Sequence, residues 1–149
     1  MLKIVLGIFF VLHGLVHLLW FVVPWRITTV DGLPYSTTVL AGRIDVGDAG
    51  IRVAGLLWLL AAIGWVIAGA GLIFLAPWWQ PVTIAVALFA AALCILGLPV
   101  AKYGLLINLA VVGFVLLNGQ FHWPAVKVLH RASPFLTVLA SAVTLYLLP

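Results

Sequence analysis

The chain consists mainly of long apolar runs, separated by short turns and by one longer polar loop. The first run, residues 2–23, is long enough to cross the hydrocarbon core of a bilayer as a helix, which takes about 20 residues. Only 7% of all residues are charged, whereas a soluble domain carries about 25%. So few charged side chains cannot cover a surface exposed to water, and the sequence therefore predicts an integral membrane protein.

Breaks in the apolar pattern divide the chain into further spans. Prolines end the first and third runs, and residues 76–81, with two prolines and two tryptophans, separate the second run from the third. We expect residues 1–149 to form one all-α transmembrane bundle. Segment 134–149 is short for a span, and it is either a fifth helix or an apolar helix packed along the bundle. The four full spans are expected at about residues 2–23, 50–75, 82–98 and 104–118.

The charged residues are too few and too scattered to bind nucleic acid. The net charge is +4, but the seven cations lie near segment ends, where they can meet lipid headgroups. All three acidic residues, Asp31, Asp45 and Asp48, lie in the loop between the first two spans. The single cysteine, Cys94, has no partner for an intramolecular disulfide. The sequence accordingly predicts the lipid bilayer, and not nucleic acid, as the main partner.

Two histidines lie four residues apart inside the first span, at His13 and His17. Residues at this spacing share one helix face, and Gly7 and Gly14 near that face would let a neighbouring backbone approach. An ionisable side chain inside a membrane is costly without a partner, and it therefore marks a candidate functional site. Counting from the helix ends places Asn108 of the fourth span at a similar depth, if those ends lie on the same side. The sequence thus predicts a polar contact between His13 and Asn108 near the midplane.

Four functions compete with this structural contact for the histidine pair. A divalent metal fits the four-residue spacing, but no carboxylate inside a span completes the site. Haem needs a second axial ligand, and His122 and His130 lie near a membrane end. A proton path would use the imidazoles, but no intramembrane carboxylate continues it. A quinone or lipid headgroup would accept a hydrogen bond from His17, with Trp20 and Trp58 as flat walls, and it requires the fewest additional residues.

Three short segments resemble a group of small prokaryotic membrane proteins with a four-helix, DoxX-like layout. Residues 13–19 are similar to the opening helix of this group, residues 55–62 to its second helix, and residues 101–104 with the following Asn-Leu pair to the turn into its last helix. The chain departs from the group at Trp20, where glycine is frequent, and at Val100, where an acid often precedes the Ala-Lys pair. The resemblance implies a multi-pass protein of the prokaryotic inner membrane, linked to quinone-related redox or oxidative-stress complexes.

The leading functional prediction is a non-enzymatic accessory or structural subunit of the inner membrane. Its histidine face on the first helix would contact a partner protein, a second copy of the chain, a lipid or a quinone. One alternative is a redox component that carries haem, metal or quinone, and another is a transporter of a small solute or of protons. The sequence nominates no catalytic residue, no metal ligand and no particular cofactor. The candidate binding residues are His13, His17, Trp20, Trp58 and Asn108.

Overall fold

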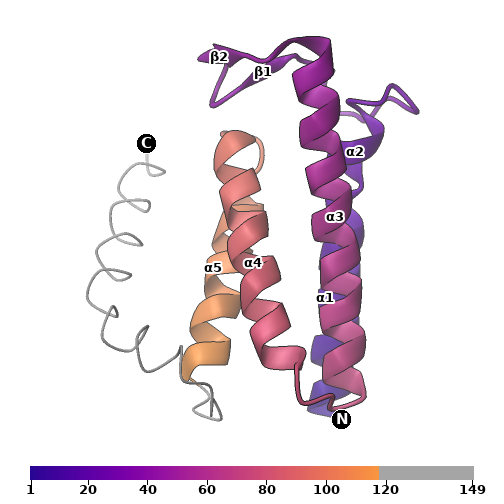
Figure 1. Ribbon diagram of the computed structural model, residues 1–149, viewed down its shortest axis with the longest axis vertical. Helices are drawn as coiled ribbons and strands as arrows, with labels where there is room; N and C mark the ends of the chain where they lie inside the picture. The colour runs from indigo at the N-terminus through magenta and orange to yellow at the C-terminus, as the bar shows by residue number, and fades with distance from the viewer. Residues whose placement is uncertain (118–149) are drawn as a thin grey trace. The chain divides into compact units, whose positions relative to one another are not determined.

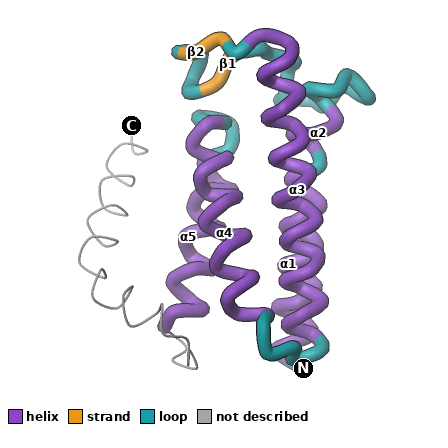
Figure 2. The backbone as a smooth tube through the Cα atoms, viewed as in Figure 1, coloured by secondary structure: helices purple, strands orange, loops and turns teal. Residues whose placement is uncertain are grey.

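The computed structural model describes residues 1–117, and this part of the chain is helical apart from short turns and one longer loop, which carries a small hairpin (Figures 1 and 2). The chain divides into two compact units after Val112, and the contacts described below lie within the first, Met1–Val112. Segment 134–149, for which a helix is expected, lies outside the described residues. The elements are α1 (Leu2–His17), α2 (Leu19–Val22), β1 (Thr38–Val39), β2 (Ile44–Asp45), α3 (Gly47–Ile73), α4 (Trp79–Leu96) and α5 (Lys102–Leu117).

Three helical segments are long and apolar enough to cross a membrane. They are Leu2–Val22, which comprises α1 and α2, together with Gly47–Ile73 and Trp79–Leu96. These segments confirm a helical, multi-pass membrane protein, and they begin and end within a few residues of the predicted spans. With 16 described residues, α5 is also apolar but shorter than a usual span of about 20 residues. The fourth span therefore stays a prediction.

Helix α1 packs lengthwise against α3 (Figure 1), because glycines allow their backbones to approach closely. A Cβ atom added to Gly14 would lie 2.7 Å from Trp65 Cβ and 3.0 Å from the carbonyl oxygen of Ala62. A Cβ atom added to Gly69 would lie 2.6 Å from the carbonyl oxygen of Gly7. The predicted role of Gly7 and Gly14 in admitting a neighbouring backbone is confirmed. This packing presses the histidine-bearing face of α1 against α3.

The hairpin in the polar loop covers the end of α4. Its two strands pair in antiparallel register, with Thr38 opposite Asp45 and Val39 opposite Ile44. At the tip, the backbone N–H of Leu40 donates to Leu96 O at 2.8 Å, and that of Ala41 donates to Leu98 O at 2.9 Å. The last carbonyl groups of a helix have no partner within the helix. The hairpin supplies a donor to Leu96, the last residue of α4, and another to Leu98 just beyond it, and thereby attaches the loop to this helix end.

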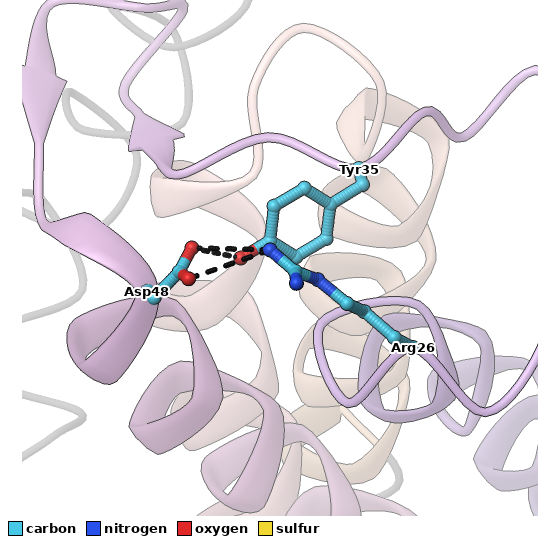
Figure 3. A network of polar contacts seen from close by, with 3 residues as sticks. All are labelled: Arg26, Tyr35 and Asp48. Carbon is cyan, nitrogen blue, oxygen red and sulfur yellow. Dashed lines mark hydrogen bonds and ion pairs between the residues drawn. The ribbon is translucent and has the colours of Figure 1, made fainter.

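A second contact ties the polar loop to the start of α3 (Figure 3). The Asp48 carboxylate accepts hydrogen bonds from the Tyr35 hydroxyl and from Arg26 Nη2, and Arg26 Nη2 lies 3.4 Å from each carboxylate oxygen. The Arg26 guanidinium also lies over the Tyr35 ring, 4.4 Å from its centroid. The side chains of Arg26 and Asp48 are 56% and 57% exposed. Because exposed ion pairs contribute little to stability, we assign this cluster to positioning the loop.

Candidate functional site

The predicted polar contact between α1 and α5 is present and deeply buried. His13 Nε2 lies 3.4 Å from Asn108 Oδ1, and the two residues are 7% and 0% exposed. Asn108 Nδ2 donates to the carbonyl oxygen of Gly104 at 2.8 Å and lies 3.6 Å from Cys94 Sγ. These bonds occupy the amide nitrogen, so the amide oxygen faces His13 and the ring nitrogen donates. The contact between His13 and Asn108 that the sequence predicts is confirmed.

The ring of His17 is held by the backbone one turn before it. His17 Nδ1 lies 3.0 Å from the carbonyl oxygen of His13. A carbonyl oxygen only accepts, so Nδ1 carries a hydrogen and donates it. Helix α1 ends at this residue, and the next N–H, that of Leu18, bonds to Leu15 O with the tighter spacing of a 3₁₀ turn. A side chain that bonds to the carbonyl four residues earlier gives a physical reason for this break in the helix.

The other ring nitrogen of His17 is free of hydrogen bonds within residues 1–117. His17 is only 3% exposed, and its Nε2 atom is buried without a partner there. Neutral imidazole carries one hydrogen, which Nδ1 uses, so Nε2 presents a lone pair. This geometry corrects the expectation that His17 donates to a ligand, because in its neutral form it accepts.

Trp65 of α3 supplies the complementary atom. Trp65 is 0% exposed, and its indole Nε1–H has no acceptor in the described part of the chain. The Trp65 ring packs edge to face with the His13 ring, and their centroids are 5.0 Å apart. The His17 ring also packs on His13, at 4.8 Å. An unpartnered acceptor and an unpartnered donor are therefore carried by two buried rings that both pack against the His13 ring.

Trp58 and Trp20 extend the site toward the end of α4. Trp58 is buried, and its ring lies 5.2 Å from that of His17. Trp20 stacks on Trp58, with centroids 5.1 Å apart and planes inclined by 18°. Trp20 is only half-buried, and a Cβ atom added to Gly97 would lie 3.3 Å from its Cη2 atom. The two rings form a flat wall whose outer member is Trp20.

The structure brings all five predicted residues into one assembly, together with a sixth that was not among them. We call this set the histidine cluster: His13, His17, Trp20, Trp58, Trp65 and Asn108. Trp65 lies seven residues after Trp58 and shares its helix face. In the sequence, this spacing indicates only that both side chains pack against a neighbouring helix. The sequence does not indicate that Cys94 lies beside Asn108, because no spacing rule connects a residue of α4 to one of α5.

The described residues contain no group of three or more His, Cys, Asp or Glu side chains that could hold a metal ion. His122 and His130, which the sequence offers as further ligands, lie outside residues 1–117. Comparison with protein-family models finds no match, and neither do searches of curated proteins and of solved structures. The resemblance to DoxX-like proteins therefore stays a prediction.

Proposed function

We propose that the chain is a non-enzymatic accessory subunit of the prokaryotic inner membrane that binds the head of a lipophilic molecule of the quinone class at the histidine cluster. One observation carries this proposal. His17 Nε2 and Trp65 Nε1 are buried among apolar helices and have no hydrogen-bond partner in the described part of the chain. A ligand with a polar head and an apolar tail would supply partners for both atoms from within the bilayer.

The energetic cost of these two atoms supports a binding role. Leaving a buried donor or acceptor unpaired costs about 1–3 kcal/mol, so two such atoms together cost about 2–6 kcal/mol. Apolar side chains at His17 and Trp65 would avoid this cost, since both lie in an apolar interior. Unsatisfied polar groups of this kind are uncommon in folded proteins and call for a functional explanation.

The shape of the cluster favours a flat ligand. Trp20 and Trp58 offer stacked aromatic faces beside His17, and planar rings pack well on such faces. The two polar atoms are buried, so a ligand reaches them only when a neighbouring side chain moves. Trp20 is the half-buried outer ring and belongs to the short helix α2. We assign the entry point to Trp20.

A second candidate is a redox component that carries a haem or metal. One specific observation favours it: the Nδ1–H of His17 donates to a backbone carbonyl, which leaves Nε2 as a lone pair. Histidines that bind metals are commonly oriented by such a bond. Further ligands would have to come from outside the described residues or from a partner chain.

Calorimetry on the detergent-purified chain tests the proposal, with decylubiquinone as the probe. The wild type is expected to bind the probe saturably, and Trp65→Phe, which removes the donor to a quinone oxygen, is expected to bind it more weakly. Trp78→Phe is the matched control, because Trp78 is 45% exposed at the start of α4. A visible spectrum and metal analysis of the same preparation separate the second candidate. Absence of saturable binding to the wild type by both this probe and its reduced form, decylubiquinol, would overturn the quinone-class proposal.

A further inference from the structure

The histidine cluster presents one buried, unpartnered hydrogen-bond acceptor and one buried, unpartnered donor within the described residues. His17 Nδ1 is committed as a donor to His13 O, 3.0 Å away, so Nε2 of the neutral ring accepts. The neutral form is the one expected inside the bundle, because all three acidic residues of the chain lie in the loop between α2 and α3 or at the start of α3. A charged imidazole would have no anionic partner among the described intramembrane residues.

Trp65 presents a hydrogen-bond donor, whereas His17 presents an acceptor. Indole nitrogen only donates, so a ligand must accept there and donate to His17. A hydroxyl group does both, whereas a carbonyl oxygen only accepts. A quinone head would pair with Trp65 and leave the His17 lone pair without a partner.

We infer that the histidine cluster prefers a hydroxyl-bearing aromatic head, such as that of a hydroquinone, over the matching quinone. This inference rests on the proposed function, which gives the class of ligand, and it adds that the reduced form of the ligand binds more tightly. It concerns binding alone and requires no electron transfer at the site. Since a buried unpaired acceptor weakens binding roughly fivefold to a hundredfold, the preference is large enough to measure.

Calorimetry with decylubiquinol and decylubiquinone, under nitrogen and in one detergent, tests the preference. The two probes share the ring substituents and the tail, and they differ in carrying two hydroxyl groups or two carbonyl groups on the ring. The wild type is expected to bind the quinol at least fivefold more tightly. Trp78→Phe, outside the cluster, is expected to keep this ratio. The wild-type ratio does not depend on whether any variant folds.

Two variants test whether the preference for the quinol arises from His17 Nε2 and Trp65 Nε1. His17→Phe removes the acceptor and is expected to bring the affinity ratio close to one. Trp65→Phe removes the donor, so both probes are expected to bind more weakly while the quinol stays the tighter ligand. Equal affinities in the wild type would overturn the inference and leave the proposed function standing. No saturable binding of either probe would overturn both, and it would be the result expected if the two atoms serve only a buried water.

Discussion

The Nδ1–H group of His17 donates to the carbonyl oxygen of His13, 3.0 Å away, and this bond determines what both rings present to the interior. His13 uses its Nε2–H on Asn108, while His17 uses its Nδ1–H on the backbone. The two histidines are therefore opposite tautomers one turn apart on the same helix face. Of these two histidines, His17 is the one whose second ring nitrogen is buried without a partner within the described residues.

Opposite tautomers are directly observable. In ¹⁵N-histidine-labelled protein, NMR is expected to show a hydrogen on Nε2 of His13 and on Nδ1 of His17. His13→Gln and His17→Gln assign the two signals, since His122 and His130 also contribute resonances. A hydrogen on Nε2 of His17 would contradict the assigned bond to His13 O and remove the basis for the hydroquinone preference.

The contact between His13 and Asn108 is expected to stabilise the fold modestly. A double-mutant cycle with His13→Phe and Asn108→Leu should give a coupling of about 0.6 kcal/mol, the usual value for a polar contact between membrane helices. Unfolding in detergent by denaturant provides the free energies. Thr83→Val is the comparison partner for His13, because the Thr83 hydroxyl donates to Trp79 O in its own helix. Equal coupling of His13 to both positions would rule out a specific contact with Asn108.

The elements and the first polar contact are accessible from the sequence, because they depend on apolar length and depth alone. Run length predicts α1, α3 and α4, and counting residues along two helices pairs His13 with Asn108. The face of α1 is also predictable, since Gly7 and Gly14 mark where a backbone approaches. Each of these inferences uses spacing along one helix or depth across the bilayer.

Which hydrogen-bond donors and acceptors the site presents depends on the rotation of each helix and on side-chain conformation. Residue spacing does not give either of these. Nothing in the pattern around His17 indicates that its Nδ1 bonds to the backbone instead of to a ligand. Likewise, Trp65 reads as packing until its indole nitrogen is found without an acceptor. The hairpin over α4 depends on left-handed backbone at Leu40 and Ala41, with φ of 53° and 58°, which residues with a Cβ atom rarely adopt.

Close packing at Gly14 predicts a strong steric effect from one added methyl group. Gly14→Ala places a Cβ atom 2.7 Å from Trp65 Cβ and 3.0 Å from Ala62 O. Overpacking of this kind destabilises by about 1–3 kcal/mol, and it should displace Trp65 and weaken ligand binding as well. Val16→Ile is the control, since it adds a methyl group on the exposed side of α1, where Val16 is 54% exposed. Similar unfolding free energies for the two variants would contradict the packing of α1 on α3.

Asp45 gives the loop a pH dependence that is independent of the membrane site. Its carboxylate accepts the Gly47 backbone N–H at 2.9 Å. This bond, together with the Thr37 side chain, lowers the pKa of Asp45 from its usual value of 3.8. A carboxyl group with a lowered pKa stabilises the fold above its unfolded pKa, and this contribution disappears as the pH falls through the folded value. Wild type is therefore expected to exceed Asp45→Asn in thermal midpoint at pH 6, and the difference should close as the pH is lowered below 3.8. A difference that does not change over this range would mean that Asp45 is not held by the start of α3.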